Sequence, residues 1–158
     1  MEFLEKIKEI ITYFTSNKIT LAIAESCTGG YISSMFTNIS GASKVFERGI
    51  ICYSNKSKVT LLNVDPESIN QYGAVSETVA KQLANNIRDL SNVDIGIGIT
   101  GIAGPTGGTP EKPVGLVYIG ISTFDITFVE KHYFDVDRIT FKAKILEKIL
   151  ILLQNFIK

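Results

Sequence analysis

Near its N-terminal end the chain reads Thr20-Leu-Ala-Ile-Ala24, then Glu25-Ser-Cys-Thr-Gly-Gly30, then Tyr31-Ile-Ser-Ser-Met-Phe36. The apolar first part predicts a short buried strand, and the last part predicts the opening turns of a helix. Backbone N–H groups at a helix start are unpaired and partly positive, so they suit a phosphate or the oxyanion of an acyl transfer. The junction also holds the Ser26 hydroxyl beside the Cys27 thiol. The alternative is an ordinary helix cap, since Ser and Thr are common there.

Strands and helices alternate on either side of this junction, and a hairpin and a last helix follow. The hydrophobic pattern predicts helices over residues 2–17, 28–38, 56–62, 76–90 and 138–157, and strands over 20–24, 48–53, 94–100, 114–122 and 126–134. Strand 94–100 alternates Ile with Gly, which is typical of a central strand crowded by helices. We expect one domain over residues 1–158, a three-layer α/β/α sandwich with a mixed, mostly parallel sheet of about five strands.

Composition excludes several classes of protein. Sixteen basic residues balance 16 acidic ones, so the chain lacks the basic footprint of a nucleic-acid-binding protein. The longest apolar run, residues 149–153, is too short to span a bilayer. The two cysteines and one histidine are widely spaced and give no metal-ligand pattern. We therefore expect a cytoplasmic protein with free thiols, no metal or other cofactor, no nucleic-acid partner and no membrane association.

Three loops follow strands that we expect to be parallel, namely residues 25–30, 53–58 and 100–108. Ligands of α/β sheets bind at the carboxyl ends of the strands, so these loops should meet at one edge. The glycines of the third loop invite a nucleotide-loop interpretation, but Pro105 and Pro110 argue against an immediate helix. A long turn that needs glycine is the alternative to a loop that lines a site.

The Ser26 hydroxyl needs a base if it is to act as a nucleophile. The only histidine, His132, falls on the predicted edge strand, and we expect it at the surface. Lys58 is the other candidate, because burial can lower a lysine pKa from about 10.4 toward neutrality and Ser–Lys pairs are a known variant. Otherwise Lys58 is a solvated surface charge. The rival nucleophile is Cys27, which with Glu25 and Lys58 would imitate a Cys-Glu-Lys amidase; otherwise Cys27 packs under the helix.

Six motifs occur in order along the chain: Ala24-Glu-Ser-Cys-Thr-Gly-Gly30, Phe46-Glu-Arg-Gly49, Tyr53-Ser-Asn55 with Lys58, Tyr72-Gly-Ala-Val-Ser76, Thr100-Gly-Ile-Ala-Gly-Pro105 and Lys112-Pro-Val-Gly115. Together they closely resemble the CinA C-terminal-domain family, the nicotinamide-nucleotide amidases. The resemblance covers nearly the whole chain. It implies hydrolysis of the carboxamide of nicotinamide mononucleotide to nicotinic acid mononucleotide and ammonia, without a metal.

The resemblance also implies roles for particular residues. Ser26 falls on the nucleophile and Lys58 on the general base, while Tyr53 would assist proton transfer. Thr100 and Gly101 match the loop that contacts the substrate. We expect the oxyanion to be held by backbone N–H groups of Thr28, Gly29 and Gly30, or by those near Gly101.

We expect Arg138 to contact the substrate phosphate, because a guanidinium fork at a helix start suits a dianion. The alternative is a surface arginine. Family members often carry a second arginine shortly afterwards, where this chain has Phe141-Lys142, so Lys142 would serve as a point charge instead.

The chain resembles the stand-alone form of the family, without the large N-terminal domain that some members carry. Apolar faces on the first and last helices lead us to expect a homo-oligomer. A second functional hypothesis is a catalytically silent module that binds a pyridine nucleotide with the same loops. A scaffold protein without a ligand is disfavoured by the Gly, Ser and Thr residues concentrated in three loops.

Overall fold

Five strands form one mixed sheet in the order β2-β1-β3-β4-β5. In this computed structural model, which describes residues 2–157, the strands are β1 (Leu21–Glu25), β2 (Phe46–Ile51), β3 (Ile95–Gly101), β4 (Leu116–Ser122) and β5 (Thr127–Tyr133). Strand β1 is parallel to both β2 and β3, whereas β4 is antiparallel to β3 and to β5. Four of the five strands therefore run in the same direction, as the sequence predicted.

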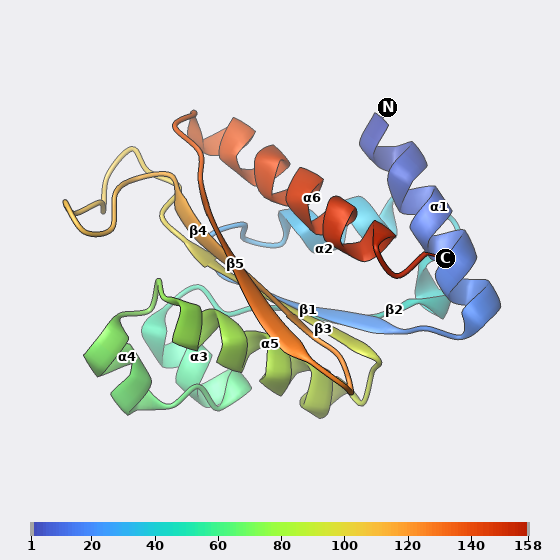
Figure 1. Cartoon of the computed structure of the whole chain (residues 1–158), viewed down its shortest axis with the longest axis horizontal. Helices are drawn as coiled ribbons and strands as arrows, with labels where there is room; N and C mark the ends of the chain where they lie inside the picture. The colour runs from blue at the N-terminus through green and yellow to red at the C-terminus, as the bar shows by residue number, and fades with distance from the viewer. Residues whose placement is uncertain (1, 158) are drawn as a thin grey trace.

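Helices cover both faces of the sheet (Figure 1). One face carries α1 (Glu2–Asn17), α2 (Tyr31–Thr37) and α6 (Arg138–Gln154), and these helices share the larger apolar cluster. The other face carries α3 (Asn55–Leu62), α4 (Pro66–Tyr72) and α5 (Glu77–Ser91), which pack on a smaller cluster. The expected α/β/α sandwich is confirmed.

Strands β1 and β3 present large side chains to one helix layer and small ones to the other. In β1, Leu21 and Ile23 belong to the larger cluster, whereas Ala22 and Ala24 belong to the smaller one. In β3 the small residues are glycines, and a Cβ added at Gly98 would lie 2.5 Å from the backbone nitrogen of Ala84 in α5. The Ile–Gly alternation therefore lets α5 approach the sheet backbone closely.

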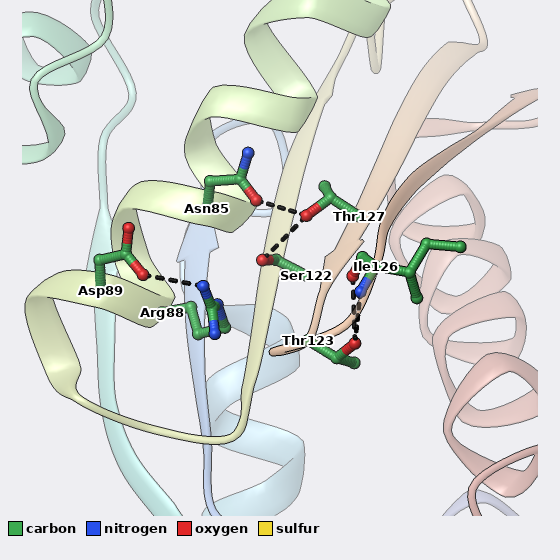
Figure 2. A network of polar contacts seen from close by, with 7 residues as sticks. All are labelled: Asn85, Arg88, Asp89, Ser122, Thr123, Ile126 and Thr127. Carbon is green, nitrogen blue, oxygen red and sulfur yellow. Dashed lines mark hydrogen bonds and ion pairs between the residues drawn. The ribbon is translucent and has the colours of Figure 1, made fainter.

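Hydroxyl contacts hold the β4–β5 hairpin together, and one of them joins it to α5 (Figure 2). The Thr127 hydroxyl donates to Asn85 Oδ1 at 2.5 Å and lies 3.1 Å from the Ser122 hydroxyl. Within the turn, the Thr123 hydroxyl accepts a hydrogen bond from the Ile126 N–H and donates to the Ile126 carbonyl. These contacts explain the tight connection that the sequence predicted at this point.

Parallel β1, β2 and β3 end at the same edge of the sheet, so the loops after them lie together there, as expected. Within residues 2–157, no helix combines the length and the apolar character needed to cross a membrane.

Some boundaries differ from the sequence-based predictions. Helix α2 begins at Tyr31 and not at residue 28, because residues 26–30 form a turn with Gly29 and Gly30 at positive φ. Helix α4 was not predicted at all. Pro66 begins this helix, which is capped by the Asp65 carboxylate, an acceptor for the Glu67 N–H.

We predict that Gly98→Ala destabilises the fold. The added methyl group would meet Ala84 N, Ala80 O and Leu83 Cβ at 2.5–2.7 Å, so α5 must move away from the sheet. Overpacking of this kind costs about 1–3 kcal/mol, which thermal unfolding detects as a lower Tm. An unchanged Tm would show that α5 is not pressed against β3.

Candidate active site

A cavity of about 320 Å³ opens where the loops after β1, β2 and β3 meet the start of α6. Loops from five parts of the chain contribute to its wall. The lining residues are Ser26, Cys27, Tyr53, Asn55, Lys58, Ala74, Val75, Thr100, Gly101, Ile102, Ala103, Gly104, Thr106, Gly107 and Arg138. Most of the residues singled out from the sequence are thus brought together around one space. His132 is not among them; it lies half-buried on the edge strand β5, 2.7 Å from the Glu130 carboxylate.

Ser26 and Lys58 are in direct contact. The Lys58 Nζ lies 2.9 Å from Ser26 Oγ, 3.0 Å from the Cys52 carbonyl oxygen and 3.1 Å from the Tyr53 carbonyl oxygen. Only 2% of Lys58 is exposed, and helix α3, capped by the Ser54 hydroxyl, carries it inward. Lys58 is therefore not a solvated surface charge.

The surroundings of Lys58 determine how its amine is oriented. As an ammonium it donates one hydrogen bond to each of its three neighbours. As a neutral amine it keeps two N–H bonds, and the carbonyls of Cys52 and Tyr53 must take them because a carbonyl only accepts. The lone pair is then left facing Ser26 Oγ. Burial lowers the pKa of the Lys58 ammonium from its ordinary value, which favours this neutral form.

Glu25 is buried directly before Ser26, and its carboxylate contacts residues 28–33 and forms no ion pair with Lys58. Its Oε2 accepts from the Thr28 hydroxyl at 2.6 Å and from the backbone N–H groups of Gly30 and Ile32. Its Oε1 accepts from the backbone N–H and the hydroxyl of Ser33. The carboxylate thus occupies the positive start of α2, where its charge is stabilised. A Cys-Glu-Lys arrangement that includes Glu25 is excluded by this geometry.

The expected oxyanion donors need a correction. Thr28, Gly29 and Gly30 do not line the cavity, and the Gly29 and Gly30 N–H groups already donate to Ser26 O and Glu25 Oε2. The physical reason is that Glu25 takes the place of an external anion at this helix start. By contrast, no other residue within 2–157 accepts a hydrogen bond from the N–H of Cys27 or of Thr28. Cys27 directly follows Ser26 and lines the cavity, so its N–H is the better candidate for an oxyanion donor.

The Cys27 thiol is a poor candidate for the nucleophile. Burial raises the pKa of this thiol to about 12, so the reactive thiolate is scarce near neutral pH. The side chain belongs to the larger apolar cluster. It therefore matches the alternative that the sequence left open, a small residue packed under the helix.

Thr100 is buried at the end of β3, and its hydroxyl donates to the Ala74 carbonyl at 2.8 Å. This contact holds the 73–76 segment against the cavity, so Ala74 and Val75 form part of the wall. Sequence reasoning did not identify these two residues, nor Asn55 and Thr106, as site residues. The signal was available, because three of the four fall inside motifs that resemble the family.

Arg138, the first residue of α6, reaches across the cavity mouth. Its Nη1 donates to the Gly104 carbonyl at 2.8 Å and its Nη2 donates to the Tyr53 hydroxyl at 2.9 Å. Within residues 2–157, no carboxylate forms an ion pair with Arg138. Lys142, one turn further along α6, does not line the cavity; its Nζ comes within 4.0 Å of the position that a Cβ on Gly29 would occupy.

Comparison with known proteins identifies the family of this chain. The family model of the CinA C-terminal domain matches residues 4–157. The chain belongs to the CinA family. It is 49% identical to a CinA-like protein of Kosmotoga olearia over 137 residues, which are 87% of this chain and 33% of that protein. The chain thus spans about a third of the length of the curated relatives it matches.

Solved structures of the CinA family share the fold. The competence/damage inducible protein CihA from Agrobacterium tumefaciens is 34% identical, with a TM-score of 0.95 over 100% of this chain and 97% of that one. A CinA superfamily protein from Escherichia coli is 26% identical, with a TM-score of 0.93 over 98% of this chain and 90% of that one. These likenesses extend over the sheet and both helix layers.

We predict that Glu25→Gln destabilises this CinA-family domain. A glutamine replaces one acceptor oxygen by an NH₂ group, which cannot accept from the backbone N–H groups that donate to Glu25. Leaving buried donors unsatisfied beside a lost charge costs about 3 kcal/mol, a fall in Tm on the order of 10 °C. Differential scanning calorimetry measures this fall.

The matched control is Glu47→Gln, which removes an exposed carboxylate paired with Arg48. Its effect should stay within about 0.5 kcal/mol. Equal effects of the two changes would contradict the helix-capping role of Glu25.

Proposed function

We propose that this CinA-family protein hydrolyses the carboxamide of nicotinamide mononucleotide, releasing ammonia and nicotinic acid mononucleotide. The observation that carries the proposal is the 2.9 Å contact between the buried Lys58 amine and the Ser26 hydroxyl in the wall of a cavity. A serine hydroxyl with a base at hydrogen-bond distance is the arrangement that nucleophilic catalysis requires.

In the proposed acylation step, the neutral Lys58 amine takes the Ser26 proton while Oγ attacks the carboxamide carbon. The Lys58 ammonium then supplies a proton to the departing nitrogen, and Tyr53 at the cavity mouth assists that transfer. The product is an acyl-serine and ammonia. In the second step the neutral amine deprotonates a water molecule, which attacks the acyl-serine and restores the hydroxyl.

The negative charge that develops on the amide oxygen needs preorganised donors. We assign this role to the N–H of Cys27, because it directly follows the nucleophile and no other residue in the described part of the chain accepts a hydrogen bond from it. Removing a single donor of this kind typically costs about 100- to 1,000-fold in rate. Glu25 supports the donor indirectly, because it fixes the turn at residues 26–30.

The charge of the cavity suits an anionic substrate. Its lining includes two basic side chains, Lys58 and Arg138, and no acidic one. If Lys58 is neutral, Arg138 provides the positive charge for the phosphate. The Asn55 amide and the Thr106 hydroxyl also line the cavity without hydrogen-bond partners among residues 2–157, so they are available to ribose hydroxyls. A mononucleotide carries both a phosphate that Arg138 can bind and ribose hydroxyls that Asn55 and Thr106 can bind.

We also propose that the protein works in the cytoplasm, because Cys27 and Cys52 are free and buried, as a reducing compartment would keep them. The reaction as proposed needs no cofactor, and its partner is the nucleotide substrate. Assembly into a homo-oligomer stays a prediction.

We predict that Ser26→Ala abolishes ammonia release from nicotinamide mononucleotide, whereas Cys27→Ala keeps most of it. The reason is that the alanine at position 26 lacks the nucleophilic oxygen, while the Cys27 thiol does not react. A coupled ammonia assay measures both. The reverse result would transfer the nucleophile to Cys27, and binding without turnover by the unaltered protein would favour the silent nucleotide-binding module.

We predict that kcat/KM rises with pH as a single group, the Lys58 ammonium, loses its proton, because only neutral Lys58 accepts the Ser26 proton. Burial lowers the pKa of Lys58, so the rise comes below the ordinary lysine value of about 10.4. The unfolded chain binds this proton more tightly than the folded protein. The free energy of unfolding therefore also increases with pH between the folded pKa and about 10.4.

The control for this pH profile is Lys58→Arg. Arginine keeps the positive charge but cannot act as a base at neutral pH, so the variant should be nearly inactive at every pH. A pH-independent activity in the unaltered protein, or an active Lys58→Arg variant, would contradict the role of Lys58 as the base.

A further inference from the structure

Within the described residues, the Tyr53 hydroxyl is held at the cavity mouth by one hydrogen bond. Tyr53 is 59% exposed, and among the hydrogen bonds of residues 2–157 its hydroxyl takes part only in the one from Arg138 Nη2, at 2.9 Å. Its ring is therefore not fixed by burial. Where the hydroxyl lies depends on where the Arg138 guanidinium lies.

The Arg138 guanidinium connects three separate loops. It belongs to the start of α6, and it donates to Tyr53 after β2 and to the Gly104 carbonyl after β3. Arg138 is exposed and has no carboxylate partner in the described part of the chain, so nothing else fixes its orientation. A guanidinium has more N–H donors than the two used here, so it can bind an anion while it keeps both contacts.

We propose that Arg138 couples the binding of an oxyanion at the cavity mouth to the position of the Tyr53 hydroxyl, so that the substrate phosphate raises turnover as well as affinity. This inference rests on the proposed function. An anion on the free donors restricts the guanidinium to one orientation, which in turn restricts Tyr53 and the loop at Gly104. Binding energy from the phosphate is thereby used to order Tyr53, the residue that we propose assists proton transfer.

The coupling has a kinetic signature that simple phosphate binding lacks. If the phosphate only adds affinity, its removal raises KM and leaves kcat unchanged. If Arg138 transmits its binding to Tyr53, the nucleoside without a phosphate loses kcat as well. Arg138 is in this sense a positioning residue for Tyr53 in addition to a contact for the phosphate.

The test compares ammonia release from nicotinamide mononucleotide and from nicotinamide riboside, with and without added inorganic phosphate. We expect the kcat for the riboside to be about 10- to 100-fold lower than that for the mononucleotide. Added phosphate should raise the kcat for the riboside about 10-fold. In Tyr53→Phe, phosphate should no longer raise the kcat for the riboside, whereas the Tyr133→Phe control should respond as the unaltered protein does. Equal kcat values for the two substrates, or an undiminished phosphate effect in Tyr53→Phe, would overturn the coupling.

A second readout does not depend on activity. Hydrogen–deuterium exchange of the unaltered protein should slow in the peptides covering residues 52–56 and 102–108 when inorganic phosphate is added. This slowing should be lost in Arg138→Gln and kept in an Arg48→Gln control. If phosphate leaves exchange in both peptides unchanged, the proposed coupling is wrong, whether or not the protein is an amidase. If exchange slows but no ammonia is released from the mononucleotide, the amidase proposal is wrong and the coupling stands.

Discussion

The site depends on the burial of the Lys58 amine. Three oxygen atoms surround it: Ser26 Oγ and the carbonyl oxygens of Cys52 and Tyr53. Removing an amine from water disfavours its charge, and no carboxylate lines the cavity to compensate. The two carbonyls can only accept, so a neutral amine must direct its lone pair at the serine. In the proposed mechanism, the backbone after β2 thus orients the base, as the aspartate does in a Ser-His-Asp triad.

Two features of the fold make this contact possible. Parallel pairing of β1 with β2 places Ser26, after one strand, beside Cys52 and Tyr53, after the other. The Glu25 carboxylate then fills the start of α2 and fixes the turn in which Ser26 lies. The sequence suggested that the start of this helix binds an anion. In the structure that anion is the carboxylate of Glu25, which belongs to the protein itself.

The sequence predicted the sheet, its helix layers and the meeting of three loops, because these follow from hydrophobic periodicity and from strand direction. It also predicted Ser26 and Lys58 as a pair, through the resemblance of the motifs that contain them. It could not show which way Glu25 points, since a carboxylate at a strand end looks the same whether it faces a thiol or a helix start. The contacts of Arg138 were equally hidden, because they join residues 85 and 34 positions apart in the chain.

The protonation state of Lys58 is the most direct test of this account. Proteins labelled with ¹³C at the lysine ε-carbon, with Lys58 assigned from the spectrum of the Lys58→Arg variant, give the pKa of this amine by NMR titration. The account predicts a pKa well below the ordinary lysine value of about 10.4, with the other lysines titrating near it. A Lys58 pKa at or above that value would contradict the account, because the amine would then be an ammonium with no lone pair for the serine proton.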